Sequence, residues 1–89
     1  MAWLDNVEQT TLDQMESAVY TLRHADDPLL VLLALAELRD VRDQLELAAV
    51  RDARENGHSW AELAEALRRP RQAVHRKHRN HDQGENNGE

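Results

Sequence analysis

The chain has 89 residues, no cysteine and a formal net charge of −6. This length suits one small domain, and the absence of cysteine excludes both a disulfide framework and a thiolate metal site. Only three residues are aromatic (Trp3, Tyr20 and Trp60), so the core must consist of Leu, Val and Ala. With three Gly and two Pro beside many Glu, Arg and Gln, the composition predicts an all-α fold of about four helices.

Charge is distributed unevenly along the sequence. Residues 1–50 hold three Lys/Arg and ten Asp/Glu, whereas residues 51–81 hold eight Lys/Arg, four Asp/Glu and four His. DNA responds to a local basic face rather than to the net charge of a protein. The pattern therefore favours an acidic, partner-facing half (residues 1–56) joined to a basic, DNA-facing half (residues 57–80).

A first helix is expected from Trp3 to about His24. Its apolar residues recur at steps of three and four, which is typical of an amphipathic helix that packs on a core. These residues are Leu4, Val7, Leu12, Met15, Val19 and Leu22. The segment Ala25–Pro28 then predicts a break, in which Asp26 or Asp27 caps the next helix and Pro28 fits its first turn.

The second expected helix is long, from Pro28 to Asn56, with Gly57 as its C-terminal cap. Its first half is apolar nearly all round, but the eight-residue run Leu29–Ala36 is far too short to span a bilayer. In its second half the apolar residues are confined to one side of the helix and form a heptad-like seam. The seam consists of Val31, Ala34, Leu38, Val41, Leu45 and Ala48.

One short hairpin does not cover both the apolar run and this seam. We therefore expect a homodimer in which a second copy packs on the seam. The alternative is a monomeric cluster of four helices, in which the C-terminal helices cover it.

Two short helices joined by a tight turn are expected in residues 57–80. Ser59 is a suitable N-cap and Glu62, three residues later, completes the sequence form of a capping box. Leu63, Ala64 and Leu67 give the first of these helices one apolar face. Pro70 ends that helix and suits the start of the next.

The last helix begins at Arg71 and is strongly basic. Ala73 and Val74 are its expected packing residues. Between Arg68 and Arg79 there are six Lys/Arg and no acidic residue. Two short helices of which the second is basic are typical of a helix-turn-helix with a recognition helix.

The residues SWAELAEAL (59–67) followed by RQAVH (71–75) resemble the helix-turn-helix of small actinobacterial regulators and of the sigma-factor region-4-like group. The resemblance is limited to about residues 59–79. It implies that Ala64 is the small residue where the two helices cross, and that residues 72–74 occupy recognition-helix positions. The turn departs from the family, which usually has Gly, Val and Ser where this chain has Arg68, Arg69 and Pro70. A left-handed conformation there costs Arg about 1 kcal/mol more than Gly.

In helix-turn-helix proteins the N-terminal part of the second helix enters the major groove, where Arg pairs with guanine and Gln with adenine. The expected base contacts are Arg71, Gln72, His75 and Arg76. Phosphate contacts set affinity and its salt dependence without reading sequence. The expected phosphate contacts are Ser59, Arg68, Arg69, Lys77 and Arg79.

Other chemistries find little support. No phosphate-binding Gly-rich loop and no nucleophile-and-base pair stands out, so an enzyme and a cofactor are not expected. His75, His78 and His81 are evenly spaced, but only Asp82 is a nearby carboxylate, so no metal site is expected and the three histidines are interpreted as polar side chains that face outward, toward the DNA groove. Trp60 is expected to pack rather than to stack on a ligand. The apolar-free tail, residues 81–89, is expected to be disordered and acidic.

The sequence thus predicts a dimeric, sequence-specific DNA-binding protein, most simply a transcriptional regulator that reads a pseudo-palindromic site in double-stranded DNA. We expect it to be cytoplasmic and nucleoid-associated, since no signal peptide or membrane span is visible. One alternative is an adaptor whose acidic N-terminal half binds a protein partner such as a polymerase subunit or a sigma factor. Another is an architectural or partition protein that binds DNA through the same residues.

Overall fold

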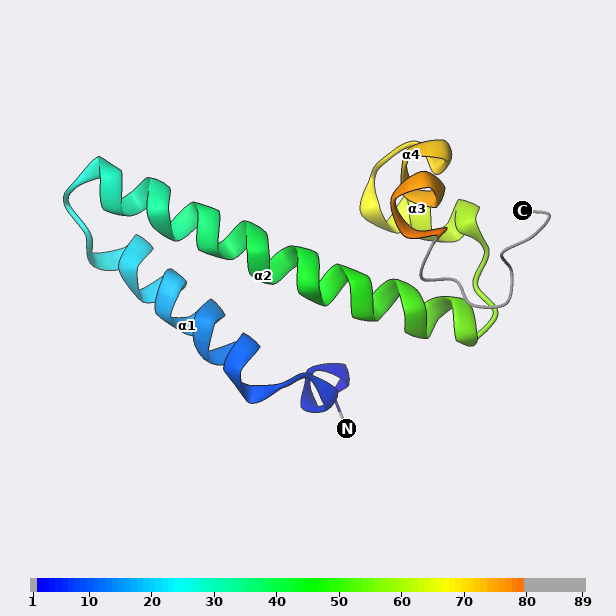
Figure 1. Cartoon of the computed structure of the whole chain (residues 1–89), viewed down its shortest axis with the longest axis horizontal. Helices are drawn as coiled ribbons and strands as arrows, with labels where there is room; N and C mark the ends of the chain where they lie inside the picture. Colours follow the sequence, from blue (N-terminus) through cyan, green and yellow to red (C-terminus); the bar gives the residue numbers. More distant parts are fainter. Residues whose placement is uncertain (1, 80–89) are drawn as a thin grey trace. The chain divides into compact units, whose positions relative to one another are not determined.

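The computed structural model describes residues 2–79, and within them the regular structure is entirely helical (Figure 1). The elements are a 3₁₀ helix η1 (Trp3–Asn6) and the α-helices α1 (Gln9–His24), α2 (Pro28–Glu55), α3 (Trp60–Leu67) and α4 (Arg71–His78). This confirms the predicted all-α fold of about four helices. None of the described helices is both long and apolar enough to cross a membrane.

The first helix begins later than the apolar pattern predicts. Residues 3–6 form a 3₁₀ turn, and Val7 is extended before α1 starts at Gln9. Asn6 and the β-branched Val7 both form α-helix poorly, which accounts for the interruption. The predicted end at His24 is confirmed.

The chain divides into two compact units, Met1–Leu45 and Glu46–Glu89, which we call the N-terminal and C-terminal units. The division falls inside α2, whereas the sequence places the module boundary at Asn56. The reason lies in the last turns of α2: Val50 belongs to the core of the C-terminal unit, and Glu46 forms ion pairs with residues of that unit.

The N-terminal unit is a hairpin of α1 and the first part of α2 (Figure 1). The Thr11 hydroxyl on α1 donates a hydrogen bond of 3.1 Å to the Gln44 side chain on α2. Its buried residues are small: Thr11 and Ala18 on α1, Ala34 and Val41 on α2. The two residues of each pair are seven apart, so each helix buries a single narrow stripe.

Both ends of α2 have the caps that the sequence predicts. The Asp27 carboxylate accepts a hydrogen bond of 2.9 Å from the backbone N–H of Leu29, and Pro28 is the first helical residue. At the other end Gly57 has φ of +91°. The N–H groups of Gly57 and His58 donate to the carbonyls of Arg54 and Ala53, both at 3.0 Å, which is a Schellman motif.

The C-terminal unit has a denser core. It combines α3 and α4 with the end of α2, and its buried apolar side chains are Val50, Trp60, Leu63, Ala64 and Val74. Ala53 and Leu67 pack against this cluster. The predicted inner face of α3 is thereby confirmed, as is the packing role of Trp60. Ala73 is exposed, so the expectation that it packs was wrong.

Candidate nucleic-acid interface

The start of α3 is a complete capping box. The Ser59 hydroxyl accepts a hydrogen bond of 3.1 Å from the Glu62 N–H, and the Glu62 carboxylate accepts one of 2.9 Å from the Ser59 N–H. The donation from Ser59, with a further contact of 3.3 Å to the His58 ring, lowers the pKa of Glu62. The predicted capping box is confirmed, and it occupies the hydroxyl of a residue predicted to contact phosphate.

The turn between α3 and α4 is a second Schellman motif. Arg68 is left-handed, with φ of 58° and ψ of 44°. Its N–H donates to Glu65 at 3.2 Å, and the Arg69 N–H donates to Ala64 at 3.1 Å. A non-glycine residue therefore occupies the position where the family resembled by the motif usually has glycine, and it carries the strain of that conformation.

Helix α4 has an inner and an outer face. Val74 and His78, one turn apart, are buried, with 0% and 2% of their surfaces exposed. Positions 72, 76 and 79 lie together on the opposite side, and Gln72, Arg76 and Arg79 are all exposed there. The outer face of α4 thus presents amide and guanidinium groups to solvent, while its inner face anchors the helix.

Trp60 joins the three helices of the C-terminal unit. The Arg54 guanidinium from α2 lies 4.7 Å from its ring centroid, and the His75 ring from α4 meets its edge at a centroid distance of 4.9 Å. Arg54 also donates a hydrogen bond of 3.0 Å to the His58 carbonyl. These contacts orient the side chain of His75, one of the predicted base contacts.

A hollow lies where α4 begins. Its volume is about 550 Å³, and it is lined by Trp60, Pro70, Arg71, Gln72 and His75. Three of the four predicted base contacts therefore line one concave surface. The fourth, Arg76, is exposed one turn beyond Gln72 on the same face of α4.

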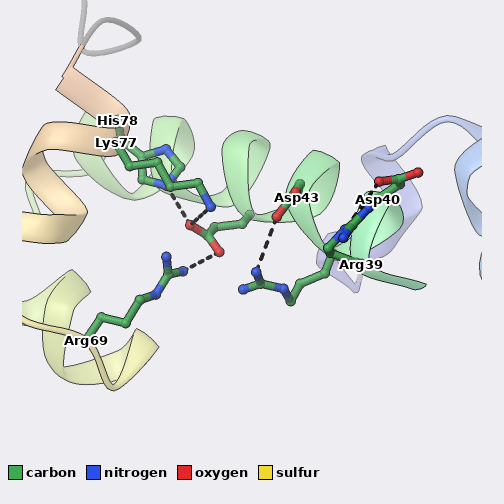
Figure 2. Close-up of polar contacts among 8 residues, drawn as sticks. Arg39, Asp40, Asp43, Arg69, Lys77 and His78 are labelled. Atoms are coloured by element: carbon green, nitrogen blue, oxygen red, sulfur yellow. Dashed lines mark hydrogen bonds and ion pairs between the residues drawn. The ribbon is translucent and has the colours of Figure 1, made fainter. Parts of the chain in front are cut away.

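A buried carboxylate binds the turn and α4 to α2. Figure 2 shows the side chains of Arg69, Lys77 and His78 directed toward one carboxylate, that of Glu46. Arg69 donates at 2.5 Å, His78 Nε2 lies at 2.6 Å and Lys77 Nζ at 3.3 Å. Only 3% of the Glu46 side chain is exposed.

These contacts decide the ionisation of Glu46. Burial by itself raises the pKa of a carboxyl group, since it disfavours the charged form. The hydrogen bonds from His78, Arg69 and Lys77 outweigh that effect and lower the pKa of Glu46 to about 2. The carboxylate is therefore charged at neutral pH, and it neutralises part of the positive charge of α4 and the turn.

The four basic residues among the predicted phosphate contacts fall into two groups. Arg68 and Arg79 are exposed at the two ends of α4, the first in the turn and the second at the C-terminal cap. Arg69 and Lys77 instead contact Glu46, with 28% and 40% of their side chains exposed. The tertiary structure thus assigns these two cations a structural contact that the sequence pattern does not reveal.

Sequence reasoning missed Glu46 and the burial of His78. The available signal was weak: Glu46 is a single carboxylate flanked by Leu45 and Leu47 in an otherwise apolar stretch. Its partners lie 23 and more residues away, beyond the reach of helical periodicity. His78 was expected to face outward with the other evenly spaced histidines, and that expectation was wrong.

The seam predicted for dimerisation is largely covered within one chain. Ala34 and Val41 are buried, and the remaining positions are half-buried. Those remaining positions are Val31, Leu38, Leu45 and Ala48. The exposed apolar side chains of α2 lie elsewhere on the helix, at its N-terminal end.

The N-terminal unit has a polar hollow of its own, of about 330 Å³ between α1 and α2. It is lined by Asp13, Gln14, Ser17, Glu37, Asp40 and Gln44. Within residues 2–79, no group of three or more His, Asp and Glu side chains is placed to hold a metal ion. The expected acidic tail and His81 lie outside the described residues.

A comparison with protein-family models, with curated proteins and with solved structures gave no significant match.

Proposed function

We propose that this protein binds double-stranded DNA in a sequence-specific manner, as a dimeric transcriptional regulator. The observation that carries the proposal is the outer face of α4. Gln72, Arg76 and Arg79 are exposed on one side of a helix whose other side is anchored by Val74 and His78. A short, firmly held helix that presents such side chains is what reading the major groove requires.

The surroundings of α4 support the same function. Arg71, Gln72 and His75 line the hollow at its N-terminal end, the part of a recognition helix that approaches base edges. Residues 66–79 contain no acidic side chain that would repel phosphate. The resemblance of residues 59–79 to helix-turn-helix regulators supports the same reading.

In this mechanism Arg71, Gln72, His75 and Arg76 contact base edges, and Arg68 and Arg79 contact phosphates on either side. Arg69 and Lys77 contribute charge from positions beside Glu46, so their effect on affinity is smaller. In a dimer the two α4 helices lie in successive major grooves of a pseudo-palindromic site, about one helical turn apart. Occlusion of a promoter is the simplest regulatory outcome.

The test is selection from random-sequence duplex DNA, repeated at two salt concentrations. We expect an enriched palindrome and affinity that falls steeply with salt. Gln72→Ala or Arg76→Ala should then weaken specific binding about 5- to 100-fold, since a good base contact contributes about 1–3 kcal/mol of discrimination. Both residues are exposed, so helicity and thermal stability should not change.

Arg23→Ala is the matched control. Arg23 is an exposed cation on α1, in the N-terminal unit, and its removal changes the net charge by the same amount as Arg76→Ala. Specific binding should be unaffected by it. Unenriched binding by the wild-type chain, or equal effects of Arg23→Ala and Arg76→Ala, would contradict the proposal and favour a protein partner for the acidic half.

A further inference from the structure

The three partners of Glu46 divide its two carboxylate oxygens unequally. Arg69 donates to Oε1 at 2.5 Å, whereas His78 Nε2 and Lys77 Nζ both approach Oε2, at 2.6 and 3.3 Å. Figure 2 shows Arg69 on one side of the carboxylate and the other two side chains on the opposite side. If Lys77 leaves, each oxygen still accepts one short hydrogen bond. The contact from Lys77 is therefore the one that the buried carboxylate loses at the least cost.

Lys77 is also the most accessible of the three partners. Its side chain is 40% exposed, against 28% for Arg69 and 2% for His78. A helix turns by about 100° per residue, which places Lys77 on the flank of α4 between the buried Val74 and the exposed Arg76. From this flank the lysine side chain reaches inward to Glu46 or outward to the surface that Arg76 occupies.

The residue type at this position favours a change of partner. Lys77 is the only lysine in the sequence, and every other cationic side chain apart from histidine is an arginine. A guanidinium is a planar fork that pairs with two oxygens at once, whereas an ammonium is a point charge on a flexible stem. A point charge exchanges one oxygen for another without reorienting a planar group.

A DNA phosphate offers Lys77 the same kind of acceptor as Glu46. Carboxylate and phosphate oxygens both form charge-assisted hydrogen bonds with an ammonium group. Glu46 is charged at neutral pH, since its pKa is lowered to about 2, and it therefore competes with phosphate for Lys77. Duplex DNA carries one negative charge per about 1.7 Å of its axis, so a phosphate is near any cation on the bound face.

We propose that Lys77 exchanges partners when DNA binds: its ammonium group leaves Glu46 and pairs with a backbone phosphate, while Arg69 and His78 keep their contacts with Glu46. Glu46 is then an internal competitor that lowers the affinity for DNA. This inference rests on the DNA binding in the proposed function and adds a residue that limits it. The net effect of Lys77 on affinity stays below that of Arg79, because its phosphate contact replaces an existing ion pair.

The experiment is a double-mutant cycle measured on DNA affinity. The full chain, Glu46→Gln, Lys77→Gln and the double variant are each titrated with a random-sequence duplex at low salt, where phosphate contacts dominate binding. Glu46→Gln should strengthen binding about 3- to 10-fold more when Lys77 is present than in the Lys77→Gln background. Only in the first case does the substitution remove an ion pair that binding must break.

Arg79→Gln is the matched control for this cycle. It removes the same charge from α4, but from the outer face, where Arg79 is exposed. The effect of Glu46→Gln should be the same, within about 2-fold, with and without Arg79. An effect of Glu46→Gln that is also the same with and without Lys77 would mean that the ion pair persists in the complex, and would overturn the proposal.

Lys77→Gln alone gives a second measurement, which holds where Glu46→Gln does not fold. The substitution leaves the two short hydrogen bonds of Glu46 in place, so the chain should remain folded. A plot of log affinity against log salt concentration should become shallower by about 0.9, the value for one phosphate contact. An unchanged slope would show that Lys77 makes no phosphate contact and would equally overturn the proposal.

These outcomes are separable from those of the sequence selection. Coupling between Glu46 and Lys77 in a chain that enriches no DNA sequence would support this inference and contradict the sequence-specific function alone. An enriched sequence without coupling, and with an unchanged salt slope for Lys77→Gln, would contradict this inference alone. A chain that binds no duplex even at low salt would contradict both.

Discussion

At the scale of single residues, two helices of this protein end in the same Schellman motif, but different residue types occupy its left-handed position. The cap after α2 contains Gly57 and the cap after α3 contains Arg68, each with positive φ and the same pair of backbone hydrogen bonds. Glycine adopts this conformation without cost, whereas an L-residue with a side chain meets its own backbone there. The molecule thus contains a relaxed and a strained version of the same cap.

This pair makes a prediction in two directions. Arg68→Gly should stabilise the folded protein by about 0.5–1 kcal/mol, since relief of strain exceeds the added flexibility of the unfolded chain. Gly57→Ala should destabilise it by about 1 kcal/mol. A Cβ at Gly57 would meet nothing within 4 Å, so conformation alone causes the loss. Denaturant unfolding measures both, and equal signs for the two variants would contradict the argument.

At the scale of elements, α4 depends on the tertiary contacts of its inner face. It has eight residues, too few to be helical in isolation, so its conformation depends on the packing of Val74 and on the hydrogen bond between His78 and Glu46. The exposed residues of α4 do not contribute to this packing. Variants of the inner and outer faces should therefore affect different properties of the protein.

Val74→Ala should lower the free energy of unfolding by about 2 kcal/mol, because the side chain is fully buried and its loss leaves a cavity. Arg76→Ala, two positions along on the outer face, should change it by less than about 0.5 kcal/mol. Denaturant unfolding followed by far-UV circular dichroism makes the comparison. Equal stabilities of the two variants would show that α4 does not depend on Val74.

In contrast to α4, the hairpin of the N-terminal unit buries no large side chain. Its narrow stripe of small side chains buries little apolar surface, while each large leucine left exposed forgoes about 1.5–3 kcal/mol that full burial would contribute. The exposed side chains of Leu29, Leu32 and Leu33 therefore limit how much α1 and α2 are stabilised by burial. A dimer that covers these side chains should raise the unfolding temperature as protein concentration rises.

At the scale of the whole molecule, charge is organised by fold as well as by sequence. The acidic half and the basic half are distinct along the chain, yet Glu46 brings one carboxylate into contact with the basic helix. Removing one partner of a buried ion pair leaves the others uncompensated and costs several kcal/mol. Glu46 is thus expected to be the charged residue on which the C-terminal unit depends most.

This dependence should appear in the response of stability to pH. The pKa of Glu46 is about 2 in the folded protein, below the ordinary value of 4.5. Its contribution to stability is therefore complete above about pH 4.5 and is lost as pH falls toward 2. The shift corresponds to about 3 kcal/mol.

Glu46→Gln provides the reference for that measurement. The difference in unfolding free energy between wild type and variant should be largest near pH 6 and should shrink between about pH 4.5 and 2.5. Taking the difference removes the titration of the other carboxyl groups, Glu62 among them. A difference that is constant over this range would mean that the carboxylate contributes no net ionic stabilisation.

What the sequence determined by itself is local. The caps at Gly57 and Ser59, a cap at Asp26 or Asp27, and the break at Pro70 each depend on hydrogen bonds or steric contacts within a few residues. The residue types at those positions therefore suffice to predict them, and the structure selects Asp27. The inner residues Leu63, Ala64 and Val74 follow from helical spacing for the same reason. The left-handed conformation of Arg68 does not follow from its residue type, since arginine disfavours positive φ, and only the structure shows it.

Only the tertiary structure decided which faces are covered. Ala34 and Val41 are buried because α1 packs on them, and Leu29, Leu32 and Leu33 remain exposed because nothing within the N-terminal unit covers them. His78 is buried and Ala73 exposed, although periodicity alone allows either. Glu46 gains partners from distant helices. Burial and ion pairing join residues far apart in the chain, and spacing along a single helix carries no information about them.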